Sequence, residues 1–146
     1  NRGLVHAISH SGRLVAIDQR SGARIWERSI GGVETPWVAG DFIYLLSNQA
    51  ELYCLTRRGG RIRWVRPLPK FEDPQDKEGP IKWSGPVLVS DRLVVTGSHG
   101  EALSISPYTG VPLGRVELPG GISIAPVVAD GTLYFFTNNA ELIAFR

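Results

Sequence analysis

The side chains best suited to metal binding or nucleophilic catalysis in this 146-residue chain are its histidines and its single cysteine. His6, His10 and His99 do not share the spacing of a metal-ligand set, so we expect solvated residues, two of them near turns. Cys54 stands at a position that related units fill with small side chains, which predicts a buried, inert thiol. A lone cysteine also excludes an internal disulfide framework and a cysteine-rich zinc site.

Carboxylates and short motifs give no stronger sign of catalysis. Glu51, Glu101 and Glu141 recur just after the same turn of successive units, so they follow from a repeat rather than from a paired acid and base. An acidic ring on one face is the functional alternative for these positions. No serine stands in a G-x-S-x-G elbow, and no glycine-rich phosphate loop opens a helix. The sequence therefore predicts no catalytic residue, no metal ligand, no cofactor and a protein that is not an enzyme.

Composition narrows the class of protein. Lysine and arginine number 16 against 14 acidic residues, and a net charge of +2 argues against a binder driven onto nucleic acid by charge. With 42% hydrophobic and 21% charged residues, the chain is typical of a globular domain. No apolar run approaches the roughly 18–20 residues of a membrane-spanning helix. The chain has no methionine, which indicates a piece of a longer protein.

An internal repeat positions all of these residues. The small residue that closes a turn recurs at Gly12, Ala50, Gly100 and Ala140. Another small side chain follows at a constant distance, at Ala16, Cys54, Ser104 and Ala144, and a glycine comes later still, at Gly22, Gly60 and Gly110. Several aligned positions in one phase indicate units of about 40 residues, the size of a propeller blade.

Each unit is expected to form four short antiparallel strands. In the second unit these are residues 36–39, 42–47, 51–56 and 62–66, joined by brief turns rich in Gly, Asn, Asp and Ser. The strand at 42–46 is apolar on both faces, which indicates a sheet covered on both sides. Radial stacking of like sheets satisfies that need, so the predicted fold is an all-β propeller of four-stranded blades; a two-sheet sandwich is the alternative.

The units are out of phase with whole blades, and about three and a half are present. We expect a partial blade at 1–30, a blade at 31–68, an inter-blade loop insertion at 69–83, a blade at 84–118 and a partial last blade at 119–146. An isolated chain of this extent would expose two raw sheet edges, which are an aggregation hazard.

One motif joins two strands of the first unit. Residues 16–26 read A-I-D-Q-R-S-G-A-R-I-W and place Asp18, Gly22 and Trp26 at fixed offsets. The aspartate can accept N–H bonds within the turn, the glycine supplies a positive φ, and the tryptophan offers a ring for packing on the adjoining blade. The second unit keeps Gly60 and Trp64, whereas the third keeps only the glycine of this trio, Gly110, and has Gly114 in place of tryptophan.

This motif resembles the repeat of the pyrroloquinoline-quinone-like (PQQ-like) β-propellers. Within that group the chain is similar to the C-terminal part of the BamB family, on residues 14–26, 40–45, 59–64, 84–88 and 125–131 in matching order. The resemblance implies an eight-bladed lipoprotein propeller on the periplasmic face of the bacterial outer membrane, which binds the barrel-assembly subunit BamA and assists the insertion of outer-membrane protein clients. Its lipid anchor would lie outside this segment, and no contact residue is carried over.

Two other functions stay open at this stage. The enzymatic relatives are quinone-dependent dehydrogenases, whose family traits are a vicinal cysteine pair over the cofactor and carboxylate and amide ligands around calcium; this segment has one cysteine and no evident ligand cluster. Trp26 and Trp64 are accordingly interpreted as packing rings rather than a cofactor floor. The third hypothesis is a PQQ-like propeller of another envelope complex.

The insertion at 69–83 is charged and rich in proline, so we expect an exposed loop. Phe71 and Trp83 flank its charges and form a candidate partner loop. The structural alternative is a tolerated insertion in which Trp83 packs on the blade.

Overall fold

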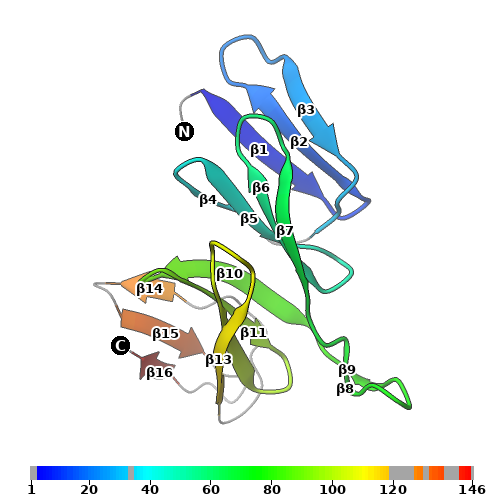
Figure 1. Ribbon diagram of the computed structural model, residues 1–146, viewed down its shortest axis with the longest axis vertical. Coiled ribbons are helices and arrows are strands. Elements are labelled where there is room, and N and C mark those ends of the chain that lie inside the picture. Colours follow the sequence, from blue (N-terminus) through cyan, green and yellow to red (C-terminus); the bar gives the residue numbers. More distant parts are fainter. Residues whose placement is uncertain (1–2, 33–34, 119–126, 130–131, 137–141, 146) are drawn as a thin grey trace. The chain divides into compact units, whose positions relative to one another are not determined.

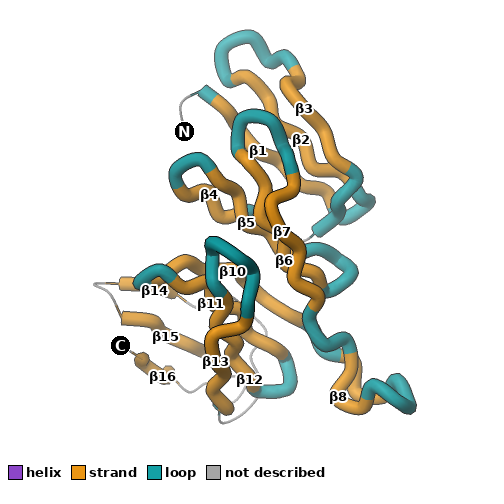
Figure 2. Tube along the Cα trace, viewed as in Figure 1, coloured by secondary structure: helices purple, strands orange, loops and turns teal. Residues whose placement is uncertain are grey.

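The computed structural model describes residues 3–32, 35–118, 127–129, 132–136 and 142–145, and within them every regular element is a β-strand (Figures 1 and 2). None of the described residues belongs to a helix able to cross a membrane. The chain divides into two compact units, residues 1–66 and residues 67–146. The predicted all-β fold is confirmed.

The first unit contains two antiparallel sheets whose strands pair in chain order. The first sheet consists of β1 (Leu4–Ser9), β2 (Arg13–Asp18) and β3 (Arg24–Arg28). The second sheet consists of β4 (Trp37–Ala39), β5 (Phe42–Leu46), β6 (Glu51–Thr56) and β7 (Ile62–Pro67). These short connections force neighbouring strands to run in opposite directions, as the turn chemistry of the sequence predicts.

The second unit begins with a small hairpin of β8 (Phe71–Asp73) and β9 (Glu78–Pro80). The third sheet consists of β10 (Trp83–Val89), β11 (Arg92–Gly97), β12 (Glu101–Ile105) and β13 (Pro112–Glu117). The fourth sheet has three described strands, β14 (Val127–Ala129), β15 (Thr132–Phe136) and β16 (Leu142–Phe145). In chain order, two four-stranded sheets therefore stand between two three-stranded ones, as about three and a half blades require.

Burial on both faces of a strand explains why the apolar runs do not alternate. In β5, the side chains from Ile43 to Leu46 are all at most 4% exposed. The core of the first unit draws on both of its sheets and consists of Leu14, Ala16, Trp26, Ile30, Ile43, Leu45 and Leu55. The two sheets thus bury their facing surfaces against each other, the arrangement expected for neighbouring blades.

The turn between the third and fourth strand positions of a blade has the same backbone hydrogen bonds in the first three repeats. In the first, Asp18 N donates to Ala23 O and Gly22 N donates to Asp18 O, both at 2.8 Å. The same two bonds recur from Thr56 and Gly60, and from Ser106 and Gly110. The three glycines have φ values of 73°, 66° and 77°, a left-handed conformation that costs a residue with a Cβ about 1–2 kcal/mol.

The inserted segment differs from the loop expected at 69–83. It contains the β8–β9 hairpin, which pairs Phe71 with Pro80 and Asp73 with Glu78, and Trp83 is the first residue of β10. The ring of Trp83 is only 5% exposed, and its Nε1 donates to Pro69 O at 2.7 Å. The physical reason is that an indole can bury its apolar surface against the sheet while the chain folding back over it satisfies its N–H.

Candidate functional site

The three histidines lie in separate environments. His10 is exposed in the turn after β1. His6 in β1 is half-buried, with Nε2 3.4 Å from Arg57 O, and burial lowers its pKa from the ordinary value. His99 packs its ring edge-on against Trp83 at 5.4 Å between centroids. Among the described residues, no group of three or more His, Cys, Asp and Glu side chains could hold a metal ion.

Cys54 lies in β6 with only 2% of its surface exposed. Burial raises the pKa of its thiol to about 11, although the Arg63 charge and a hydrogen bond with Tyr44 oppose the shift. Because the thiolate is the nucleophilic form, a thiol with so high a pKa is unreactive near neutral pH.

The recurring glutamates have different partners. Glu51 accepts a hydrogen bond from the Tyr53 hydroxyl at 3.1 Å, whereas Glu101 lies 3.1 Å from Arg115 and 3.4 Å from His99. Glu141 lies outside the described residues. Each described glutamate is thus held by residues of its own sheet.

Trp26 is the best-defined feature that the sequence singled out. Its ring is 8% exposed, and its Nε1 donates to Arg57 O of the second sheet at 2.9 Å. The His6 ring lies on the same face of the first sheet, with its centroid 5.7 Å from that of Trp26. A buried indole that both packs and donates across two sheets fixes their relative position, because neither contact survives a slip of one sheet.

The turn that receives the indole is shaped to it. A Cβ added to Gly60 would lie 2.5 Å from the Trp26 ring, so only glycine fits there. Arg28 closes the contact from the other side: its Nε donates to Gly60 O at 2.7 Å, its Nη2 donates to Gly59 O at 3.0 Å, and its Cζ lies 5.7 Å from the indole centroid. We call this group, Trp26 and Arg28 with residues 57–60, the Trp26 joint.

The other motif residues occupy related positions. Asp18 Oδ1 accepts hydrogen bonds from the N–H groups of Arg20 and Ser21 at 2.8 and 3.3 Å, which closes the turn. Trp64 is half-buried and packs its ring against Tyr44 at 6.3 Å. In the third sheet, Gly114 pairs with Ser104 where the first sheet pairs Trp26 with Ala16.

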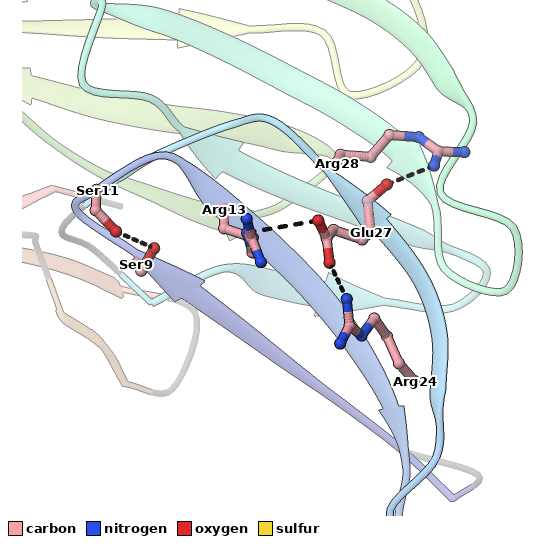
Figure 3. A network of polar contacts seen from close by, with 6 residues as sticks. All are labelled: Ser9, Ser11, Arg13, Arg24, Glu27 and Arg28. Carbon is pink, nitrogen blue, oxygen red and sulfur yellow. Dashed lines mark hydrogen bonds and ion pairs between the residues drawn. The ribbon is translucent and has the colours of Figure 1, made fainter.

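The opposite face of the first sheet carries a cluster of ion pairs around Glu27 (Figure 3). Glu27, next to Trp26, lies between Arg13 at 3.4 Å and Arg24 at 2.5 Å, and both arginine side chains are more than 60% exposed. Exposed ion pairs of this kind contribute only about 0–1 kcal/mol each. The joint is therefore held by the buried face of β3 and not by its charged face.

Of the two rings in the candidate partner loop, Phe71 and Trp83, the structure buries one. Trp83 is buried and presents no ring to a partner, so the structural alternative holds for this residue. Phe71 is half-buried at the start of the hairpin, and the hairpin residues around it are mostly exposed. Of the two rings that the sequence indicated, only Phe71 stays a candidate for contact with a partner.

Sequence reasoning missed two partners of the joint. Arg28 lies in β3 and the Arg57 carbonyl lies in the turn after β6, so their contacts in the joint depend on how the first two sheets pack. A signal for the arginine does exist, because Arg66 follows Trp64 at the offset by which Arg28 follows Trp26. No comparable signal marks a carbonyl, which every residue has.

Comparisons by sequence with known proteins find relatives of the same description. A family model described as outer membrane protein assembly factor BamB matches residues 1–66. The BamB of Salmonella typhimurium is 35% identical over 97% of this chain, and the aligned part is 34% of that protein. The chain spans about a third of the length of this curated relative.

Solved structures give the same fold. The crystal structure of BamB from Moraxella catarrhalis matches 98% of this chain with a TM-score of 0.75 at 20% identity, over 42% of that protein. Quinohemoprotein alcohol dehydrogenase from Comamonas testosteroni matches 92% of the chain with a TM-score of 0.73 at 14% identity, over 27% of its length. At these identities the likeness shows the fold alone, and it confirms the predicted partial propeller.

Proposed function

From the premise that this chain is related to the BamB assembly factors along nearly its whole length, we propose that it is part of a non-enzymatic interaction propeller that assists the assembly of outer-membrane proteins. Its partners are proteins: a BamA-like barrel-assembly subunit and unfolded outer-membrane clients. It works at the periplasmic face of the outer membrane, associates with the membrane only through a lipid anchor outside this segment, and binds no nucleic acid.

The observation that carries this proposal is the 35% identity to a curated BamB over 97% of the chain. Proteins with this fold include dehydrogenases, so the fold by itself does not separate a scaffold from an enzyme. The sequence identity does favour one of them, because the dehydrogenase neighbour is only 14% identical to this chain over the aligned residues.

Two described surfaces suit protein partners. The β8–β9 hairpin extends beyond the repeat and presents Phe71 among exposed polar residues. In the third sheet, β13 pairs with β12 alone among the described strands, and all six of its residues are exposed. An open strand edge of this kind can accept a further strand from a client through main-chain hydrogen bonds.

Affinity purification of the full-length parent protein from solubilised outer membranes tests the proposal. Recovery of a barrel-assembly subunit supports it, and recovery of a different envelope complex without that subunit contradicts it. Phe71→Ala should reduce the recovery if the hairpin is a contact. Tyr108→Ala removes a ring that is 72% exposed in another turn, and it is the matched control.

The alternative function is that of a quinone-dependent dehydrogenase, which the fold likeness to quinohemoprotein alcohol dehydrogenase favours. Reconstitution of the full-length protein with pyrroloquinoline quinone and calcium, followed by dye-linked oxidation of an alcohol, separates the two functions. Turnover above the level of the protein-free control would contradict the scaffold proposal.

A further inference from the structure

The third sheet has a hollow where the first two sheets place a tryptophan. Its volume is about 290 Å³, at the small end of ligand pockets, which suits one side chain rather than a larger ligand. The walls come from β11, β12 and β13 and from Leu133 of β15, so the hollow belongs to one compact unit. Gly114 lies in its lining, and a Cβ added there would meet nothing closer than Ser104 Oγ at 3.6 Å.

The corresponding place in the first two sheets is filled by a pair of rings. His6 and Trp26 lie 5.7 Å apart in the first sheet, and Tyr44 and Trp64 lie 6.3 Å apart in the second. The third sheet has Val94 and Gly114 at these two positions. Both rings of the pair are therefore replaced by smaller groups while the backbone register is kept, with Ser104 opposite Gly114.

The lining of the hollow is apolar with a cation at its edge. Val94, Ala102 and Leu133 are each at most 8% exposed, and Val116 is 42% exposed. Arg115 also lines the hollow but is paired with Glu101 at 3.1 Å. Arg92 lines the hollow and is exposed, and no ion pair joins it to another described residue.

We propose that this hollow is a binding site for an aromatic side chain of a partner polypeptide, with an acidic neighbour of that residue held by Arg92. The partner's ring would take the place that Trp26 fills in the first sheet, and its stacking surface would be Val94, Ala102 and Leu133. Offset packing of a ring on such walls buries apolar area, and a carboxylate beside it gains a charge-assisted hydrogen bond. The inference depends on the repeat geometry and not on the proposed assembly role.

Three dipeptide probes test the site on the full-length protein. Acetyl-Trp-Asp-amide, acetyl-Trp-Lys-amide and acetyl-Ala-Asp-amide are titrated while the methyl NMR signals of Val94, Val116 and Leu133 are followed. The Trp-Asp probe should shift these signals in a saturable way and bind several-fold more tightly than the Trp-Lys probe, because only the former complements Arg92. The Ala-Asp probe should cause no saturable shift.

Filling the hollow from within gives the decisive variant. Gly114→Trp restores the side chain of the first two sheets and should weaken the Trp-Asp probe by at least about tenfold, a loss of about 1.4 kcal/mol. Gly114→Leu is a smaller filler that decides the question if the tryptophan variant does not fold. Leu113→Trp is the matched control: it adds an indole at the adjacent residue, which is 48% exposed and does not line the hollow, and it should leave the affinity unchanged.

Several results would overturn the inference. Absence of a saturable methyl shift with both tryptophan probes excludes an aromatic site. If the Ala-Asp probe binds as tightly as the Trp-Asp probe, the ring does not contribute to binding. If the Trp-Lys probe binds as tightly as the Trp-Asp probe, Arg92 does not contribute. Unchanged affinity in a folded Gly114→Trp or Gly114→Leu protein places the ligand elsewhere.

Discussion

The first and third sheets have the same backbone hydrogen bonds in one turn, but they differ in the side chain that follows it. Both close the same turn with the same two backbone hydrogen bonds, through Gly22 in one and Gly110 in the other. On the first sheet, Trp26 is buried against the neighbouring turn, whereas on the third sheet Gly114 borders a hollow. The comparison teaches that local hydrogen bonds maintain the repeat, while the packing between sheets depends on one aligned side chain that the repeat does not require.

The largest effect is expected from removing the ring of the joint. Trp26→Ala should lower the free energy of unfolding by about 3–5 kcal/mol, because it leaves a cavity in the core of the first unit. Trp26→Phe keeps a ring but leaves the Arg57 carbonyl without its indole donor, so its cost should be smaller, about 1–3 kcal/mol. Urea unfolding of the full-length protein measures both. A cost below 1 kcal/mol for Trp26→Ala would mean that the joint does not hold the sheets.

The next prediction separates the fit of the Trp26 ring from the backbone conformation of the turn that receives it. Gly60→Ala should cost more than Gly22→Ala, although both glycines have a positive φ that costs about 1–2 kcal/mol for alanine. The added methyl at Gly60 meets the Trp26 ring, whereas nothing lies within 4 Å of it at Gly22. Thermal unfolding of the two variants gives the difference, which is the contribution of ring fit. Equal costs would contradict a turn shaped to the indole.

A smaller effect concerns pH. Burial lowers the pKa of His6 from the ordinary 6.5, so the folded protein binds its proton less readily than the unfolded chain does. The stability associated with neutral His6 is present above pH 6.5 and is lost as the pH falls through the lowered pKa. His6→Gln should reduce the slope of unfolding free energy against pH between neutral and mildly acidic conditions. An unchanged slope would place the acid sensitivity elsewhere.

The smallest effect is expected on the third sheet. Gly114→Ala should change the free energy of unfolding by less than about 1 kcal/mol, and the change should be neutral or stabilising, because alanine reduces the freedom of the unfolded chain and fits the folded one. The same melting experiment checks it. A destabilisation as large as that of Gly60→Ala would show that the hollow is closed in solution.

Much of this fold could be predicted from the sequence because its determinants are local. In the second repeat, residues 31–68, strand bounds follow from apolar runs between turn residues, and β6 begins at Glu51 and ends at Thr56 as expected. Glycines with a positive φ mark the turns, and the two-sided apolar pattern of β5 indicates the layers on either side of it.

The rest depended on contacts between distant residues. The recurrence of an arginine two residues after the tryptophan marks Arg28, but no sequence pattern shows that Arg28 contacts the turn at residues 59–60 or that the Arg57 carbonyl accepts from Trp26. The hairpin at Phe71–Asp73 and Glu78–Pro80 was missed because a proline-rich, charged segment has weak strand propensity, and pairing overrides it. The hollow beside Gly114 was missed because the sequence shows only that glycine replaces the tryptophan of the motif. Whether another residue fills the space depends on the neighbouring sheet.

In the turns after β2, β6 and β12, different side-chain oxygen atoms accept hydrogen bonds from the backbone N–H groups. Ser106 Oγ lies 3.2 and 3.3 Å from the N–H groups of Tyr108 and Thr109, the same two positions that Asp18 serves with its carboxylate. The Thr56 hydroxyl accepts from Arg61 N instead. Duplicated modules of this kind are thus free to drift at the aspartate as long as a short oxygen-bearing side chain remains. Searches for degenerate copies should accordingly weight the left-handed glycine above the acidic residue that precedes it.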